Sequence, residues 1–415
     1  MKIMVIGSGG REHALCWKIA QSPLCTNLYA APGNWGMSNI AETLHISVDD
    51  HQGLIEAAKH LHIDLIIIGP DDALASGLVD SFKSAGLTVF GPEKAAARLE
   101  WSKSYAKSFM DKHGIPTARW QECHSAEEAL LALKGCNFPL AVKIDGLALG
   151  KGVIIAHTAA EASEAISRLA ELGSPAEVFI LEEFLSGREL SYLMMCDGHT
   201  FRALPVSEDH KQLADGDTGP NTGGMGAVSP PLWLTSEILS RIEDEIVIPT
   251  WQGIQQEGLD YRGILYIGLM VTADGPRVLE YNARFGDPEA QAVLLRLKSD
   301  LVPLLLACCQ GGLESEVLEV HADASACLVL AAPGYPEDPV KGLAVTGLEN
   351  LDAEVIPFYA GIRSYNGELQ TSGGRVLALS ALGSDLEKAL EIIYSNAERV
   401  TFKGKQYRHD LGRRR

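Results

Sequence analysis

The first hundred residues alternate continuous apolar runs with stretches of helical patterning. The runs KIMVIG at 2–7 and DLIIIG at 64–69 are continuously apolar after their first residue, which predicts strands that are buried on both faces. The expected strands lie at 2–7, 27–32, 44–48, 64–69 and 88–91, and the expected helices at 11–21, 51–60 and 72–85. This alternation is typical of a parallel sheet with helices on both faces, an open α/β domain.

The pattern changes after residue 92. A long helix is expected over 93–113, and Gly114 and Pro116 then interrupt it. A smaller α/β unit follows, with helices at 125–134 and 159–172 and strands at 139–145, 152–157 and 178–184. Hairpins at 190–206 and 263–282, each with an Asp-Gly turn, flank a helix over 235–256. The tail carries short strands and one helix, so it is expected to be mostly β.

Length and composition limit the possible functions. The 415 residues suffice for two to four domains, and 46% apolar with 21% charged residues is typical of a soluble globular protein. The net charge is −19, and Lys and Arg cluster only in the terminal RRR, so binding to nucleic acid is not expected. A small local basic pocket is still compatible with this composition. MKIMVIGSGG turns from apolar residues to glycine too soon for a signal peptide, so none is expected. No apolar run is long enough to span a membrane, and the eight cysteines form no Cys-x-x-Cys pair. A cytoplasmic protein with reduced thiols is expected.

Oxygen-bearing side chains gather in VLEYNARFGDPE, residues 278–289. On a regular strand Val278, Glu280 and Asn282 share one face, and Leu279 and Tyr281 share the other. A carboxylate removed from water is costly unless it is paired or bound to a metal. Glu280 and Asn282 therefore predict a cation at the end of this strand.

The first glycine turn, in IGSGGREHA, follows a strand and opens a helix. It departs from the dinucleotide-binding fingerprint, because Glu12 occupies the place of the third glycine and no acidic residue ends the second strand. Two interpretations stay open: amides at a helix N-terminus that bind a phosphate or carboxylate, or a plain strand-to-helix turn.

A second glycine-rich loop lies in VKIDGLALGKGV, residues 142–153. Lys143 stands inside an apolar strand and shares a face with Ala141 and Asp145. The spacing of the loop does not match a Walker A loop, since three residues separate Gly146 from Gly150 and a glycine follows Lys151. It predicts a mobile flap whose amides and lysines close over a polyphosphate; the alternative is a surface hairpin with one lysine reaching water.

Two further segments have open interpretations. FILEEFLSGRELS places Glu182 and Glu183 at a strand end and Glu189 beyond a glycine turn, which suits either a solvated strand terminus or a clamp for a nucleoside. Residues 209–230 are rich in glycine and poor in side chains that pack. Such a segment is either a long mobile loop or backbone that approaches a ligand closely, and long loops in compact domains are often functional.

These segments, in this order, resemble the ATP-grasp family. The resemblance rests on GSGGREHAL, GPDDALASGLVD, AVKIDGLALGKGV, LEEFLSGRELS, DGDTGPNTGGMGA and NARFGDPEAQ, and it spans nearly the whole chain. It implies an ATP-grasp fold at 103–323, with a mobile lid at about 124–190, a Rossmann-like domain at 1–102 and a small, mostly β domain at 324–415. It also implies a reaction in which ATP, glycine and 5-phosphoribosylamine give glycinamide ribonucleotide, ADP and phosphate through glycyl phosphate, early in purine synthesis.

The resemblance implies roles for individual residues on the nucleotide side. Glu280 and Asn282 match the ligands of Mg²⁺ or Mn²⁺, although YIGLMV on the preceding strand lacks the further acid that many members have. Lys143 matches a catalytic lysine that contacts the phosphates, and Lys103 matches another nucleotide lysine. The remaining nucleotide-binding matches are Gly150, Lys151 and Gly152 in the flap, Glu182 near the adenine amino group, the backbone of Phe184 and Leu185 at the base edge, and Glu189 near the ribose.

On the acceptor side the resemblance implies a wider set. Arg284, as a catalytic or binding residue, can hold a carboxylate or phosphate with paired donors, or instead form a salt bridge with Asp287 or Glu289. The candidates for phosphoribosylamine and glycine are Gly9, Gly10, Asp217, Asn221, Gly223, Gly224, Met225, Gly226, Arg284 and Asp287. Only small-molecule partners and a monomer are expected.

Three alternatives compete with this interpretation. Another ATP-grasp ligase, such as a carboxylase subunit, is disfavoured by RFGDPE and the first-domain segments. A nucleotide-dependent dehydrogenase is disfavoured by Glu12 and the missing acid for a ribose. A non-catalytic nucleotide-binding module is expected to lack Lys143 or Glu280, and both are present.

Overall fold

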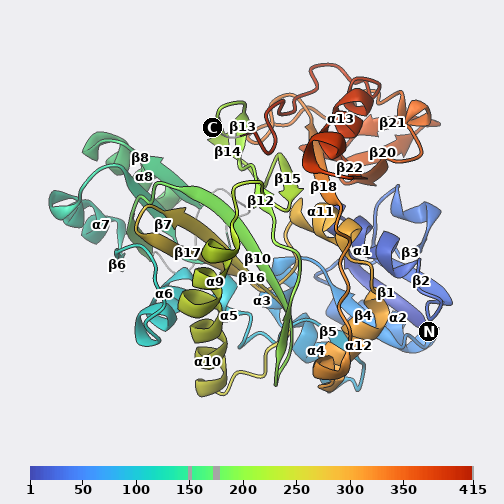
Figure 1. Ribbon diagram of the computed structural model, residues 1–415, viewed down its shortest axis with the longest axis horizontal. Helices are drawn as coiled ribbons and strands as arrows, with labels where there is room; N and C mark the ends of the chain where they lie inside the picture. Colours follow the sequence, from blue (N-terminus) through green and yellow to red (C-terminus); the bar gives the residue numbers. More distant parts are fainter. Residues whose placement is uncertain (148–151, 172–177, 414–415) are drawn as a thin grey trace.

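The computed structural model describes residues 1–147, 152–171 and 178–413. Its four larger sheets are the N-terminal sheet (β3-β2-β1-β4-β5), the lid sheet (β6-β9-β7-β8), the central sheet (β11-β10-β16-β17) and the C-terminal sheet (β12-β15-β18-β22-β19). Figure 1 shows the N-terminal unit at the right, the C-terminal unit above it and the lid sheet projecting at the left. The central sheet connects them.

The N-terminal sheet is parallel, as the sequence predicts. Its strands are β1 (Lys2–Gly7), β2 (Asn27–Pro32), β3 (Glu42–Thr43), β4 (Leu65–Ile68) and β5 (Val89–Phe90). Met4 and Ile6 of β1 pack in one buried cluster, and Ile3 and Val5 pack in another on the opposite face. The covering helices are α1 (Gly10–Ile19), α2 (His51–Leu61), α3 (Asp71–Ser76) and α4 (Leu78–Ser84). The open α/β domain is therefore confirmed.

Three local predictions in this region are wrong. The strand expected at 44–48 does not form, because the chain turns after Leu44, where the Ile46 amide donates to the Leu44 carbonyl at 2.7 Å. The helix expected at 72–85 is two helices, because Gly77 at φ +87° ends α3. The long helix expected at 93–113 is also divided, into α5 (Arg98–Trp101) and α6 (Lys103–Lys112), because Ser102 is extended and caps α6.

The central sheet is antiparallel and contains both predicted hairpins. Its strands are β10 (Arg188–Asp197), β11 (Phe201–Ala203), β16 (Arg262–Thr272) and β17 (Gly275–Asn282). The predicted helix over 235–256 forms as α9 (Ser236–Ile242), a π-helical stretch Glu243–Val247 and α10 (Ile248–Gln256), which cover one face. On the other face lie α11 (Glu289–Arg296) and α12 (Leu301–Gln310).

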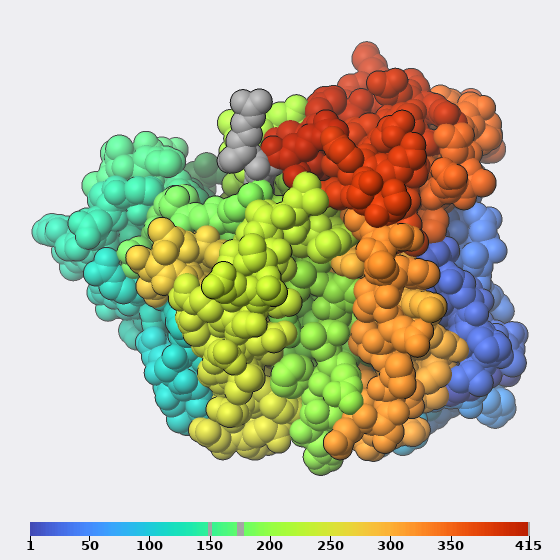
Figure 2. Space-filling view, in the orientation of Figure 1, coloured from blue at the N-terminus to red at the C-terminus, as the bar shows by residue number. Residues whose placement is uncertain are grey.

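The lid sheet is a separate two-layer unit. It comprises β6 (Trp120–Cys123), β7 (Leu140–Ile144), β8 (Val153–Ala156) and β9 (Phe179–Glu183), covered by α7 (Ala126–Ala132) and α8 (Ala159–Glu171). Val142 and Leu181 of the sheet pack with Ile166 of α8 in a small core of its own. Figure 2 shows this unit as a lobe at the left of the molecule.

The C-terminal sheet takes strands from two distant parts of the sequence. β12 (Glu208–Asp209) and β15 (Gly226–Ser229) lie about a hundred residues before the other strands of this sheet, and β15 pairs with β18 (Ala324–Ala331). The sheet continues with β22 (Arg375–Gly383) and β19 (Ile356–Tyr359), and α13 (Leu386–Ala397) covers it; β20 (Ile362–Tyr365) and β21 (Glu368–Thr371) form a separate hairpin. Residues 209–230 are thus no structureless loop, since they also form the hairpin of β13 (Gln212–Ala214) and β14 (Thr218–Asn221).

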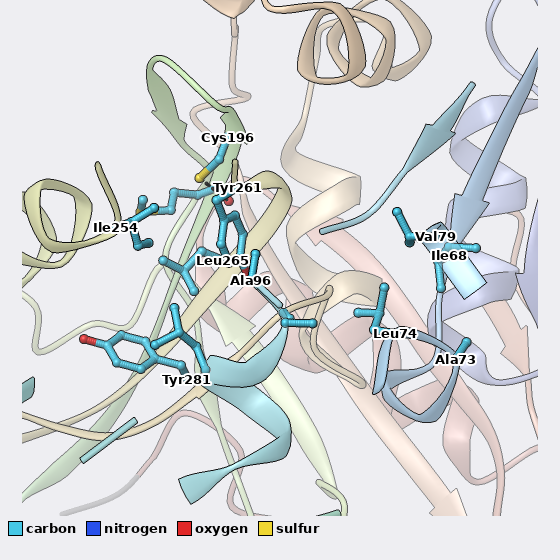
Figure 3. Close-up of a cluster of buried hydrophobic side chains, with 14 of the residues drawn as sticks. Ile68, Ala73, Leu74, Val79, Ala96, Cys196, Ile254, Tyr261, Leu265 and Tyr281 are labelled. Carbon is cyan, nitrogen blue, oxygen red and sulfur yellow. Dashed lines mark hydrogen bonds between the residues drawn. The ribbon is translucent and has the colours of Figure 1, made fainter. Parts of the chain in front are cut away.

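One buried cluster joins the N-terminal unit to the central sheet. Figure 3 shows its labelled members passing from Ile68 and Leu74, through Ala96, to Leu265 and Tyr281. Because interiors pack at nearly crystalline density, this continuity fixes the N-terminal unit against the strand that carries Glu280.

Two observations bear on the composition. All eight cysteines lie among the described residues, and each is a free thiol. No helix in the described part of the chain is long and apolar enough to cross a membrane.

Candidate active site

A cleft of about 510 Å³ lies where the four larger sheets meet. The lid sheet contributes Lys143, the central sheet Glu280, the N-terminal unit Arg11 and the C-terminal unit Arg375. A polar cavity that takes charged side chains from every unit is the leading candidate for the active site.

The end of β17 carries a bulge that corrects the predicted alternation. Glu280 pairs with Gly268 of β16, whereas Val278 pairs with the next residue along, so Leu279 is the extra residue. Val278 therefore packs in the same core cluster as Tyr281 and does not share a face with Glu280. Glu280 and Asn282 still share a face, and both line the cleft.

Cations surround the Glu280 carboxylate. Lys211 places Nζ 3.3 Å from Glu280 Oε1 and 3.6 Å from Glu189 Oε2. Lys211 foremost, then Lys143 and Lys103, lower the pKa of Glu280 to about 2 against the opposing effect of burial. Burial would lower the pKa of Lys211, but Glu280 and Glu189 raise it well above its usual range. Glu280 is thus an anion at neutral pH, and Lys211, which the sequence analysis missed, is its nearest counter-ion.

The donor set at the strand end fits a hard divalent ion. Glu280 offers carboxylate oxygens and Asn282 an amide oxygen, the ligand types that Mg²⁺ prefers. Within the described ranges no group of three or more His, Cys, Asp or Glu residues could hold a metal. A metal ion held here needs further oxygens from nucleotide phosphates and water, which is how Mg²⁺ is usually bound.

Both ends of the predicted flap adjoin the cleft. At its start the Lys103 ammonium donates to the Gly146 carbonyl at 2.7 Å, and Asp145 accepts from the Ser104 hydroxyl at 2.7 Å. Lys103 is the first residue of α6, at the point where the predicted helix over 93–113 is interrupted.

The other predicted nucleotide residues are only partly visible. Gly152, Phe184 and Leu185 line the cleft, and Phe184 is partly exposed as an apolar surface. Gly150 and Lys151 lie outside the described residues. The placement of Phe184 and Leu185 suits an adenine edge, but their role stays a prediction.

Glu182 and Glu183 face different surroundings. The Glu182 carboxylate is almost fully buried and pairs with two ammonium groups, those of Lys143 and Lys107. Glu183 pairs instead with the exposed Arg119 at 3.0 Å. The sequence analysis missed Lys107, although a lysine at an apolar position of the helix pattern AKSFM is a usable signal.

Arg284 lines the cleft and joins it to the N-terminal unit. Its guanidinium lies 2.8 Å from the Glu100 carboxylate and 3.8 Å from that of Asp71. The salt bridge expected with Asp287 or Glu289 is therefore wrong, because the N-terminal unit supplies nearer acids. Burial raises the pKa of Glu100 to about 7, although Arg284 opposes this.

The Asp287 carboxylate contacts the N-terminal glycine turn. Asp287 accepts from the Arg11 amide at 3.4 Å and pairs with Arg375 at 3.3 Å. Burial would raise the pKa of Asp287, but Arg375 and Arg11 lower it below its usual range. A Cβ on Gly9 would lie 2.7 Å from a Glu12 carboxylate oxygen, and one on Gly10 would lie 2.6 Å from Gln291 Nε2. These glycines therefore make room for side chains of the chain itself, and neither lines the cleft.

Glu12 explains why the turn departs from a dinucleotide fingerprint. A Cβ on Gly7, Gly9 or Gly69 would come within 2.7 Å of Glu12 side-chain atoms. The carboxylate accepts from the Gly9 amide at 2.6 Å and pairs with Arg11 at 2.6 Å. It therefore fills the space that a pyrophosphate would need.

The glycine-rich segment reaches the cleft at only part of its length. Asn221 and Gly223 line the cleft. The Gly223 carbonyl accepts from Arg375 at 2.7 Å, and its amide donates to the Tyr335 hydroxyl at 3.0 Å. The sequence analysis missed Arg375, whose only signal is a charge opening an apolar strand after two glycines.

The following glycines serve contacts within the chain. Gly224 is at φ +110°, and a Cβ there would lie 2.4 Å from Pro288 Cδ. Met225 is fully buried, and a Cβ on Gly226 would lie 2.6 Å from the Cys327 carbonyl oxygen. Close packing against the chain itself, and not against a ligand, accounts for Gly224 and Gly226.

Asp217 lies away from the cleft. Its carboxylate pairs at 2.8 Å with Arg408, which is fully buried and also pairs with Asp410. This arrangement ties the β13–β14 hairpin to the C-terminal segment, and it favours a structural role for Asp217 over the substrate contact predicted from the sequence.

The lid over a central antiparallel sheet, with Lys143 of the lid, Lys103 of α6 and Lys211 gathered around a carboxylate at a strand end, defines an ATP-grasp ligase. Such enzymes use ATP together with a divalent metal ion. The chain belongs to the phosphoribosylglycinamide synthetase family, whose models match residues 1–100 (N domain), 101–290 (ATP-grasp domain) and 325–414 (C domain).

Individual relatives agree with this assignment. The chain is 45% identical to the phosphoribosylamine–glycine ligase of Pasteurella multocida, over all of this chain and 98% of that protein. It is 38% identical to the crystal structure of the Thermotoga maritima phosphoribosylamine–glycine ligase, with a TM-score of 0.86 over 99% of this chain and 100% of the other. Biotin carboxylase from Campylobacter jejuni is 14% identical with a TM-score of 0.76, covering 98% of this chain and 92% of that one, a likeness of fold alone.

The activity follows from the family. The chain joins glycine to 5-phosphoribosylamine with cleavage of ATP to ADP and phosphate, a step of purine biosynthesis. The alternatives of a dehydrogenase and of a carboxylase subunit are thereby set aside.

Proposed function

We propose that ATP with Mg²⁺ occupies the part of the cleft under the lid sheet, and that glycine and phosphoribosylamine occupy the part beside Arg284. The observation that carries this proposal is the convergence of Lys103, Lys143 and Lys211 around the ionised Glu280. Phosphoryl transfer depends on positioning and charge neutralisation, which is what such a cluster supplies.

In this proposal Glu280 and Asn282 hold the metal ion, either Mg²⁺ or Mn²⁺. When bound, the ion would neutralise negative charge on the phosphates. Lys143 and Lys103 bind phosphate oxygens. Glu189 accepts from the ribose hydroxyls, while Phe184, Leu185 and Glu182 surround the base; Gly150, Lys151 and Gly152 close over the phosphates.

Arginines define the acceptor end. Arg284 orients the glycine carboxylate so that an oxygen attacks the γ-phosphorus, the bond to ADP breaks and glycyl phosphate forms. The amine of phosphoribosylamine then attacks the carbonyl carbon, and phosphate leaves. Arg11 and Arg375, both lining this end, are positioned to bind the phosphate of phosphoribosylamine.

The proposal also covers the organisation of the molecule. We expect domains at 1–102, 103–323 and 324–415, with a lid at about 124–190 that closes on ATP. Its own small core supports movement of the lid as a unit. A cytoplasmic monomer is expected, and the free thiols are consistent with that compartment.

Isotope transfer tests the chemistry directly. Glycine labelled with oxygen-18 in its carboxylate is supplied with ATP, Mg²⁺ and phosphoribosylamine, and the released phosphate is analysed by mass spectrometry. An acyl phosphate transfers one carboxylate oxygen of glycine to each phosphate. Phosphate without label, at full turnover, would refute the intermediate.

A further inference from the structure

A buried ion triad connects the lid sheet to the central unit. Glu182 of β9 pairs with Lys143 of β7 and with Lys107 of α6. The side chains of Lys107 and Glu182 are 3% and 1% exposed, so this carboxylate is withdrawn from water and its charge must be compensated within the protein.

Lys107 is fixed to the central unit and not to the lid. Its ammonium donates to the Thr117 hydroxyl at 2.7 Å, and that hydroxyl donates to the Val278 carbonyl of β17 at 2.7 Å. The neighbouring residues Ala106 and Phe109 belong to the core shared by the N-terminal unit and the central sheet. Lys107 is therefore held by residues outside the lid sheet.

Lys143 is the partner on the cleft side of the triad. It lines the cleft, and its charge acts on both Glu280 and Lys103. Two ammonium groups face one carboxylate, so the triad carries a surplus positive charge on its cleft side. Lys143 can turn from Glu182 to an entering phosphate only if Glu182 keeps another counter-ion.

Resting on the proposed role of Lys143, we propose that Lys107 is a positioning residue: it neutralises Glu182 and so releases Lys143 to bind the phosphates of ATP. Without Lys107, the sole cation of a buried carboxylate would have to leave it whenever ATP binds. Binding of ATP would then leave the buried Glu182 carboxylate without a counter-ion, which costs free energy, so the affinity for ATP would fall.

A double-mutant cycle tests this role by the Kd of MgATP, measured by calorimetry on the full chain. Lys107→Met is expected to raise Kd at least about tenfold, with KM for glycine unchanged, because Glu182 retains Lys143. In a Glu182→Gln background no buried carboxylate remains, so adding Lys107→Met is expected to leave Kd within about threefold. Lys107→Arg keeps the charge and is expected to stay within about threefold of the wild type.

The controls separate the possible failures. Lys112→Met changes an exposed lysine on the same helix and is expected to leave Kd unchanged. A tenfold loss from Lys107→Met that persists in the Glu182→Gln background would overturn the proposal, as would wild-type affinity in Lys107→Met alone. If Lys107→Met alone does not fold, a tenfold loss of MgATP affinity on adding it to Glu182→Gln would still overturn the proposal. Normal MgATP binding in Lys143→Met would instead refute the proposed function of the cleft.

Discussion

His13 is expected to make the contact between the N- and C-terminal units sensitive to acid. Its ring, on α1, stacks on Tyr359 at 5.5 Å between centroids and meets Phe358 edge-on at 5.7 Å. Nδ1 accepts a hydrogen bond from the Tyr359 amide at 2.8 Å, a bond that only an unprotonated nitrogen can accept. Burial lowers the pKa of His13 from 6.5 to about 4.

The size of the effect follows from this shift. Above pH 6.5 the ring is neutral in both the folded and the unfolded chain, and its stabilising contact is fully present. Between pH 6.5 and about 4 only the unfolded chain binds the proton, so stability falls as the pH falls. At about pH 5 the loss amounts to about 2 kcal/mol in the free energy of unfolding.

Urea unfolding of the wild type at about pH 7.5 and about pH 5 measures this loss. Tryptophan fluorescence is a suitable signal, because Trp17 packs on Phe358 and Trp35 on Tyr359. His13→Asn keeps an acceptor, and His13→Phe keeps the ring size, but neither variant titrates. In both variants the difference in unfolding free energy between the two pH values is expected to be about 2 kcal/mol smaller than in the wild type, whatever their stability at neutral pH.

Two results would contradict this reasoning. If both variants retain the acid sensitivity of the wild type, protonation of His13 is not its cause. A direct NMR titration that places the pKa of His13 at its ordinary value of 6.5 would remove the premise.

Three further outcomes are expected. Glu280→Gln should fold normally and lose at least about 100-fold in kcat, because a neutral amide balances less cationic charge during transfer. Glu257→Gln, at a surface salt bridge, should keep the kcat of the wild type. Unchanged turnover in Glu280→Gln would refute the metal assignment. Gly224→Ala should lower the free energy of unfolding by at least about 1 kcal/mol in a denaturant titration, because φ +110° and Pro288 oppose a Cβ, and an equally stable variant would contradict that geometry. Asp217→Asn should weaken the pair with Arg408 and lower the melting temperature while leaving KM for phosphoribosylamine unchanged, and a raised KM would place Asp217 in the substrate site.

Local patterns in the sequence predicted much of the fold and part of the site. Buried parallel strands, hairpins with Asp-Gly turns and Lys143 within an apolar strand each depend on neighbouring residues, so a short window reveals them. Glu280 and Asn282 were found for the same reason. The bulge at Leu279 was not, because it depends on the pairing partner and not on the strand's own residues.

The missed residues depend on contacts between distant segments. Lys107 of α6, Lys211 after β12 and Arg375 of β22 reach the cleft from segments far apart in the sequence. The local signals at Lys107 and Arg375 do not show that these segments meet. The glycines of residues 224–226 looked suited to a ligand, but they match Pro288 and Cys327, which lie far along the chain. Contacts of this kind can be identified only from the tertiary structure.

Pairing of β15 with β18 has a consequence for synthesis of the chain. Residues 226–229 leave the ribosome about a hundred positions before residues 325–328, to which they hydrogen-bond. Until then this strand presents an unsatisfied edge that could capture another nascent chain. A fragment ending before residue 324 would keep that edge permanently, so we expect it to aggregate even though it contains all of the Mg²⁺ ligands that we propose.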